Sequence, residues 1–278
     1  MSLHRRGFVL SFCFRPALSI GLLLASPVVS LAADGSHWWS GDWYLKLGAS
    51  GFYAPRYEGS DSYLLQASPM ISLGKHGNPV RFSSRNDNAS FGLFDYGAMR
   101  AGLTGKLVMP RDKDDSDDLK GLKPIDFGVE IGGFAEAYPT DWLRVRGEVR
   151  QGIRSHTGVV ADFAADAFTD VAPDIRISAG PRLSFASNDY MDAYYGVNAS
   201  ESAKSGLSQY NPGGGIHSAG VGAEITWKAT DKIDTSAFAE YTRLLGDAAD
   251  SSLVKERGSA NQFLVGVSAT YRFDFTVP

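Results

Sequence analysis

Cysteine is almost missing from this chain of 278 residues, and the single Cys13 lies in a segment that we expect to be removed. Neither disulfides nor zinc–thiolate sites are therefore available to stabilise the remainder. Long apolar runs are missing as well: beyond residue 33 no run of 18 apolar residues occurs, which excludes membrane-spanning helices there. A basic surplus is also lacking, since the formal net charge is −4, so no nucleic-acid partner is expected.

The N-terminus has the layout of a secretory signal peptide. A basic start with three arginines precedes an apolar run over residues 17–31, which ends in small residues suited to cleavage. Pro27 interrupts the run, which argues against an anchor helix that is never cleaved. We predict a signal peptide over residues 1–33 and one large β domain over residues 34–278.

The clearest pattern is the alternation of residues 262–275. Successive side chains of a strand point to opposite faces, so this period of two predicts a strand rather than a helix. Its length of fourteen residues corresponds to roughly 45 Å, or roughly 30 Å across a bilayer when the strand is tilted. Aromatic residues mark the ends of such strands at the headgroup level. The girdle candidates are Trp43, Tyr53, Tyr271, Phe273 and Phe275.

Comparable amphipathic stretches recur along the whole chain and alternate with turns. Short turns contrast with long polar loops at 110–123, 198–213 and 246–261, an asymmetry typical of transmembrane barrels. We predict an all-β fold, a transmembrane antiparallel β-barrel of about 12 strands, with 10 as the alternative. The short pieces 79–85 and 89–96 and the segment 190–197 are included among the strand candidates.

A second group of strands carries charges on one face only. A soluble β-sandwich could leave such a face in water, but the number and uniformity of these hairpins favour a barrel with a wet lumen. Glutamates and arginines on neighbouring strands are then expected to pair across the lumen. The predicted lumen-lining charges are Glu130, Glu136, Arg144, Arg146, Glu148, Arg150, Arg176 and Arg182.

Candidate catalytic and metal-binding groups are weak. His156 follows Ser155 and precedes Asp162, but neighbours in sequence do not make a catalytic triad. The aspartates of residues 112–118 lack the glycine and the closing glutamate of an EF-hand loop. We therefore predict no catalytic residue, no metal site and no cofactor.

Several motifs, taken in order, resemble those of the MipA/OmpV family of Gram-negative outer-membrane proteins. The resemblance covers about residues 42–275. The residues that carry it are Pro55-x-Tyr57-x-Gly59-Ser60-x-x-Tyr63, Arg150-Gln151-Gly152 before His156-x-Gly158, Gly180-Pro181, Tyr194-Tyr195-Gly196-Val197, Ser202-x-x-Ser205-Gly206-Leu207-x-x-Tyr210, Leu245-Gly246-Asp247-Ala248 with Asp250-Ser251, Gly258-Ser259-x-x-Gln262 and Tyr271-x-Phe273.

This resemblance implies a non-enzymatic protein embedded in outer-membrane lipid. It further implies a scaffold that links a lytic transglycosylase of the MltA type and a penicillin-binding protein at the periplasmic face. A small-solute channel, or a stress-responsive or adhesive outer-membrane protein, is the alternative. No catalytic residue is carried over from the family.

Overall fold

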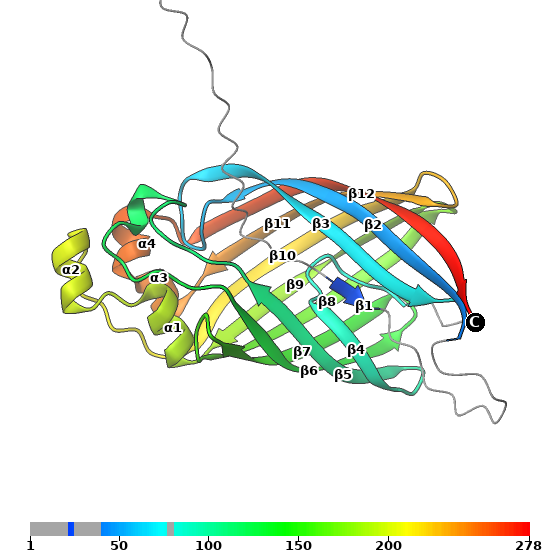
Figure 1. Cartoon of the computed structure of the whole chain (residues 1–278), viewed down its shortest axis with the longest axis horizontal. Helices are drawn as coiled ribbons and strands as arrows, with labels where there is room; N and C mark the ends of the chain where they lie inside the picture. Colours follow the sequence, from blue (N-terminus) through cyan, green and yellow to red (C-terminus); the bar gives the residue numbers. More distant parts are fainter. Residues whose placement is uncertain (1–21, 25–39, 77–80) are drawn as a thin grey trace, which may run out of the picture.

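The computed structural model describes residues 22–24, 40–76 and 81–278 (Figure 1). Apart from residues 22–24, the predicted signal peptide lies outside the described residues. The strands are β1 (Leu22–Leu24), β2 (Gly41–Pro55), β3 (Tyr63–Lys75), β4 (Ala89–Asp95), β5 (Met99–Val108), β6 (Gly128–Thr140), β7 (Leu143–Ile153), β8 (Val159–Ala172), β9 (Ile175–Ala186), β10 (Gly215–Lys228), β11 (Ile233–Leu244) and β12 (Asn261–Val277). The helices are η1 (Asp117–Leu119), α1 (Asn188–Tyr195), α2 (Ala199–Ser205), α3 (Gly246–Asp250) and α4 (Ser252–Arg257).

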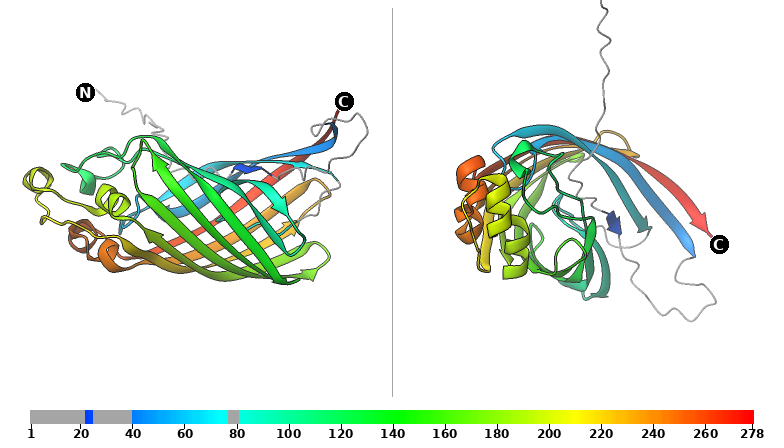
Figure 2. Two further views of the ribbon diagram at one scale, coloured as in Figure 1. Left: turned by 90° about the horizontal axis from the view of Figure 1, so that it is seen from below. Right: turned by 60° about the vertical axis from the view of Figure 1, so that its left-hand side comes forward.

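All strands belong to one curled sheet in the order β1-β3-β2-β12-β11-β10-β9-β8-β7-β6-β5-β4. Every pair from β3 round to β4 is antiparallel, and the C-terminal strand β12 pairs with the N-proximal β2. Figure 2 shows the sheet bent around a central space, with the short β1 in the gap between its two sides. The predicted all-β antiparallel barrel fold is confirmed, although β3 and β4 share no ladder within the described part of the chain.

The alternation of apolar and polar residues gives the curled sheet an apolar outer face and a polar inner face. On β12, Phe263, Val265 and Val267 are more than half exposed, whereas their neighbour Gln262 is 8% exposed. The outer face is thus apolar and exposed, whereas the inner face is polar and covered. This is the reverse of the usual pattern of a water-soluble protein, and it suits a barrel surrounded by lipid. Among the described residues, no helix is long and apolar enough to cross a bilayer.

The strand count is twelve, but not with the expected members. From residue 40 onward the described chain forms eleven strands, and the twelfth, β1, falls inside the predicted signal peptide. The predicted piece 89–96 corresponds to β4. The predicted piece 79–85 is not a strand in its described part, because residues 81–85 lie in the lumen instead of in the wall.

The segment 190–197 is also not the strand we predicted, since most of it forms α1. Tyr190, Met191 and Tyr195 are its buried residues, and their spacing places them on one face of a helix. The segment was mistaken for a strand because five aromatic or apolar residues fall within the six positions 190–195. The long loops are therefore partly helical rather than irregular.

The helices form a cap at the long-loop end of the barrel, opposite the short turns and the C-terminus (Figure 1). One apolar cluster of the cap joins α1, α3 and α4, and a second joins the loop after β2 to η1 and α4. The buried members are Val160, Ala186, Tyr190, Met191, Tyr195, Leu244, Ala248 and Val254 in the first cluster, and Tyr57, Leu119, Val197, Leu207 and Leu253 in the second. The first cluster thus packs the cap against the ends of β8, β9 and β11.

Candidate functional site: a plugged lumen

The lumen-facing charges of β5 to β9 form one buried network. Alternation along β7 directs Arg144, Arg146, Glu148 and Arg150 to the same side, and each is no more than 5% exposed. Burial of an unpaired charge would be costly, so such a face is stable only when every member has partners.

Arg150 has three carboxylate partners. Its Nε and Nη1 lie 2.8 Å from Glu130 Oε2 and from Glu148 Oε2, and its Nη2 lies 2.6 Å from Asp162 Oδ2. The partners come from β6, β7 and β8, so a single guanidinium connects three adjacent strands. Charge-assisted bonds of this length are among the stronger hydrogen bonds in proteins.

Arg146 is the next lumen-facing arginine of β7 toward the short-turn end. Its Nη1 donates to Glu136 Oε2 at 2.9 Å, its Nε donates to Glu148 Oε1 at 2.7 Å, and its Nη2 donates to Ser90 Oγ at 2.5 Å. The pairing of Arg146 with Glu136 and of Arg150 with Glu130 agrees with the cross-strand pairing expected from the sequence.

Arg144 binds a segment that is not part of the wall. Its Nη1 and Nη2 each lie 2.6 Å from one carboxylate oxygen of Asp87, and Nη2 lies 3.0 Å from Asp166 Oδ2. Asp87 Oδ2 also accepts from the backbone N–H of Ser84 at 2.9 Å. Asp87 belongs to residues 81–88, which connect to β4 and contain no helix or strand. We call residues 81–88 the plug.

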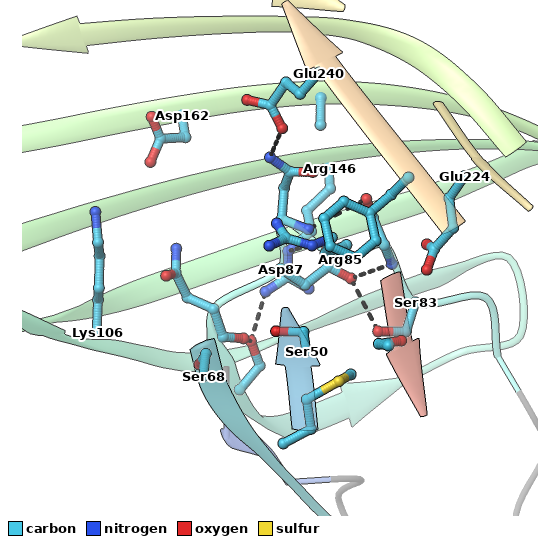
Figure 3. A pocket seen from close by; sticks show the side chains of 18 of the residues that line it. Ser50, Ser68, Ser83, Arg85, Asp87, Lys106, Arg146, Asp162, Glu224 and Glu240 are labelled. Atoms are coloured by element: carbon cyan, nitrogen blue, oxygen red, sulfur yellow. Dashed lines mark hydrogen bonds and ion pairs between the residues drawn. The ribbon is translucent and has the colours of Figure 1, made fainter. Parts of the chain in front are cut away.

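The plug reaches both sides of the lumen (Figure 3). On one side, the ring of Phe82 stacks on Phe168 of β8 with centroids 4.4 Å apart. On the other side, the Arg85 guanidinium lies 3.8 Å from the ring centroid of Phe238, and Asn86 Nδ2 donates to Glu240 Oε2 at 2.5 Å; both partners lie on β11. The Arg85 guanidinium also lies 5.2 Å from the ring centroid of Phe52 on β2, so the plug is held between β8 on one side and β11 and β2 on the other.

Space remains around the plug. A cavity of about 1700 Å³ runs along the lumen, lined by the plug, by the charged strands and by hydroxyl-bearing residues of the facing strands. The hydroxyl side includes Ser50, Ser68, Ser236 and Ser268, and Ser236 Oγ lies 2.8 Å from Ser268 Oγ. The cavity is large enough for small polar solutes.

Two predicted lumen residues lie apart from the core of the network. Arg182 reaches it through Asp166, with its side chain 14% exposed. Arg176 instead pairs with Asp170 at the short-turn end, where Nε lies 2.7 Å from Oδ1 and both side chains are more than a third exposed. The structure thus places seven of the eight predicted charges along the cavity and Arg176 outside it.

Four of the five predicted girdle residues lie on the exposed outer face, and the fifth is buried. Tyr53, Tyr271, Phe273 and Phe275 are between 40% and 51% exposed on the outer face, with Tyr53 near the cap and the other three near the C-terminus. Trp43 differs because it is only 6% exposed, although it lies directly opposite Phe275 in the β2–β12 ladder.

His156 does not contact Asp162. Its Nε2 lies 3.2 Å from Glu130 Oε1, and its Nδ1 accepts from the backbone N–H of Gly158. Asp162 binds Arg150 and Ser184 instead. The histidine therefore extends the ion-pair network toward the cap, and its ring packs edge-on against Tyr190 at 4.9 Å.

At the cap end of the lumen, Tyr190 contacts two histidines, His156 of the β7–β8 connection and His217 of β10. His217 of β10 lies 5.4 Å from the Tyr190 ring, and its Nε2 lies 3.2 Å from Glu58 Oε1. Burial, with a smaller contribution from the charge of Glu58, raises the pKa of Tyr190 well above its ordinary value. Tyr190 is therefore neutral at physiological pH and donates to Glu58 Oε2 at 3.3 Å.

Three further carboxylates complete the network. Asp162 and Asp166 alternate inward on β8, and the sequence favours polar lumen residues over metal ligands for this pair. Asp87 had no comparable signal, because nothing in the pattern of residues 81–88 indicates that they enter the lumen. The aspartates near 112–118 form local turns, with Asp115 Oδ2 accepting from Asp112 N–H; among the described residues no cluster of potential metal ligands occurs.

A sheet of amphipathic antiparallel strands, apolar outside and charged inside, defines the class of outer-membrane β-barrel proteins. Comparison with known proteins agrees: the chain is 27% identical over 245 residues to the outer membrane protein Omp26La of Vibrio anguillarum, and 26% identical over 244 residues to the outer membrane protein OmpV of Vibrio cholerae. Each match covers 84% of this chain and 87% of the relative.

Solved barrels align over most of the chain at low similarity. The NanC porin aligns with a TM-score of 0.41 and 6% identity, covering 84% of this chain and 99% of that one. A loop-deletion mutant of OmpT from Vibrio cholerae aligns with a TM-score of 0.39 and 7% identity over the same shares. The sequence model of the family described as MltA-interacting protein MipA matches residues 47–273, and the chain belongs to this family. It is an outer-membrane protein.

Proposed function

We propose that this protein is a plugged outer-membrane barrel that serves as a scaffold for peptidoglycan-processing enzymes at its periplasmic rim. The observation that carries the proposal is the plug, which Asp87 and Arg144 hold across the lumen. A barrel whose interior is filled in this way is suited to present its rims to other proteins. The family description, MltA-interacting protein, supports a lytic transglycosylase as one partner.

The scaffold needs no reaction centre in this chain. The buried charges that sequence analysis offered as candidates are satisfied by one another, and His156 is bound to Glu130 and to the backbone. We therefore propose that the protein has no catalytic activity of its own and that a penicillin-binding protein is recruited together with the transglycosylase.

The test is co-purification from detergent-solubilised envelopes with the refolded chain 34–278 as bait. We expect a lytic transglycosylase or a penicillin-binding protein to be enriched, as read by mass spectrometry. Lys232→Glu lies at the short-turn rim and Lys204→Glu lies in α2 of the cap, so the two variants make the same charge change at opposite ends.

Loss of the enzymes with the Lys232→Glu variant, together with their retention by the Lys204→Glu variant, would place the partner surface at the periplasmic rim. Recovery of neither enzyme by the unchanged chain would contradict the scaffold. A reversed pattern would contradict the assignment to the rim.

The second candidate is a small-solute channel, favoured by the cavity of about 1700 Å³ along the plug. Conductance across planar bilayers tests this candidate. We expect the unchanged protein to show no sustained open state, because the plug crosses the lumen. A steady conductance in the unchanged protein would favour the channel over the plugged scaffold.

A further inference from the structure

The sheet ends in two strands, β3 and β4, and the short β1 contacts both of them. β3 and β4 are its outermost strands except for the three-residue β1, which pairs in parallel with Ile71–Leu73 of β3 and also packs against β4. β1 belongs to the predicted signal peptide, so we expect the exported protein to lack it. The exported chain then has a seam between β3 and β4 at the place that β1 occupies (Figure 2).

An open seam is incompatible with the hydrocarbon region of a lipid bilayer. Backbone N–H and C=O groups on a free edge have no hydrogen-bonding partner in hydrocarbon, which is why membrane-spanning sheets are closed. β3 presents thirteen residues and β4 seven at this edge. The seam must therefore be filled by the chain's own strands, by the plug or by another protein.

The plug is not available to fill the seam as an additional strand. Asp87 is bound to Arg144, Phe82 is stacked on Phe168 and Asn86 is bound to Glu240, and all three contacts would be lost in the wall. As a strand, residues 81–88 would also direct either Ser84 and Asn86 or Arg85 and Asp87 toward lipid. Neither set suits a lipid-facing surface.

The direction of the two edges follows from the ladders. Ten antiparallel interfaces lead from β3 round the sheet to β4, and an even number of reversals makes β3 and β4 run in the same direction. We propose that β3 and β4 pair with each other in parallel in the exported protein, which closes an eleven-stranded barrel around the plug. Bacterial single-chain barrels ordinarily have an even number of antiparallel strands, so this seam would be their exception.

A parallel ladder is slightly less stable per residue than an antiparallel one, and here its length is limited by the short β4. The β3–β4 seam is therefore the weakest ladder of the barrel. The plug leads directly into the seam, since Asn88, the last residue of the plug, immediately precedes β4 and donates to Glu148 of β7.

Disulfide cross-linking in isolated outer membranes tests the seam. The full chain carries Cys13→Ser, so that it contains no native cysteine, and receives one cysteine at Ala67, Ile71 or Leu73 of β3 and one at Ala89, Phe91 or Phe94 of β4. All six positions alternate toward the outer face. A disulfide requires Cβ atoms about 4 Å apart, so only truly adjacent strands are joined.

We expect at least one of the nine pairs to give a mobility shift that is lost on reduction, to an extent comparable with the control Leu47→Cys/Ile71→Cys. This control shares the β3 residue and joins it to its established β2 partner. Ile71→Cys with Val149→Cys, on the distant β7, should remain uncross-linked.

Cross-linking of the control in the absence of any β3–β4 cross-link would overturn the proposal. A cross-link between Ile71→Cys and Ser83→Cys would overturn it as well, because it would place the plug in the wall. Heat-modifiable mobility on gels establishes for each variant that the barrel has folded.

Discussion

The two walls of the lumen provide partners for their inward-facing polar side chains in different ways. The charged wall, β5 to β9, buries Arg144, Arg146 and Arg150 against carboxylates from three neighbouring segments, the plug, β6 and β8. The hydroxyl wall, formed by β10 to β12 with β2 and β3, carries most of the serines and threonines that line the cavity, together with acids such as Glu224 and Glu240. Its cross-strand ion pair, Lys46–Asp234, has side chains that are 33% and 28% exposed.

Both walls hold the plug, but through different contacts. Each buried arginine of the charged wall requires partners, and Asp87 of the plug supplies one of them. On the hydroxyl wall, Glu240 accepts from Asn86 and the Phe238 ring lies beside the Arg85 guanidinium, while hydroxyls such as those of Ser236 and Ser268 bind each other. The charged wall therefore holds the plug through a buried ion pair, whereas the hydroxyl wall holds it through a hydrogen bond and a cation–π contact.

The largest expected effect comes from removing a central cation of the charged wall. Arg144→Met keeps the length of the side chain but leaves Asp87 without its bidentate partner and Asp166 with Arg182 alone. We expect a loss of about 3–5 kcal/mol in the free energy of unfolding, the usual consequence of breaking a buried ion pair from one side. Urea unfolding in detergent, followed by tryptophan fluorescence, measures this loss. A loss below about 1 kcal/mol, the value of an exposed ion pair, would contradict the role of the network.

A smaller effect is expected when only the plug side of the same contact is changed. Asp87→Asn keeps the shape of the side chain and leaves Arg144 paired with Asp166. We expect a loss of about 1.5–3 kcal/mol, typical of hydrogen bonds to a charged group, together with the appearance of open-channel events in planar bilayers. Unchanged conductance would show that the plug is retained by its other contacts.

The strands of the barrel wall could be predicted from the sequence far better than the position of the plug. On β7 and β12 the alternation is regular, and each residue's face follows directly from its position. The plug follows no such rule, because its place depends on partners far along the chain: Asp87 is 57 residues from Arg144, and Asn86 is 154 residues from Glu240. In α1, buried aromatic residues obscured the helical period, so local pattern and tertiary packing pointed to different structures.

The third prediction concerns Tyr190, where the two walls meet the cap. Burial raises its pKa above its ordinary value of about 10, so its neutral form is favoured in the folded state. Such a group stabilises the fold fully below pH ~10, and this contribution is lost as the pH rises through the pKa of the folded state. We expect the urea midpoint to fall above pH ~10, and to fall less in Tyr190→Phe, which cannot ionise.

The absorbance of tyrosinate, recorded over the same pH range, identifies the transition. Tyr190→Phe should remove a component that titrates late in the unchanged protein. If both proteins lose stability in parallel with pH, the effect belongs to other tyrosines of the cap.

The smallest effect is expected on the hydroxyl wall. Ser268→Ala removes one hydroxyl–hydroxyl hydrogen bond of 2.8 Å in a hydrated lumen. We expect the free energy of unfolding to change by no more than about 1 kcal/mol, since water can replace the lost partner. The same unfolding assay serves here, and a loss as large as that of Arg144→Met would remove the distinction between the two walls.

The helix α2 has a practical consequence for work with living cells. It has no buried residue, it is closed at its start by a capping box between Asn198 and Glu201, and it ends at Gly206 in a left-handed conformation. Since long loops of outer-membrane barrels face the outside, α2 would be among the first parts that an antibody or a phage meets. A short epitope inserted among residues 202–205 should therefore be displayed on intact cells while the barrel beneath it assembles as before.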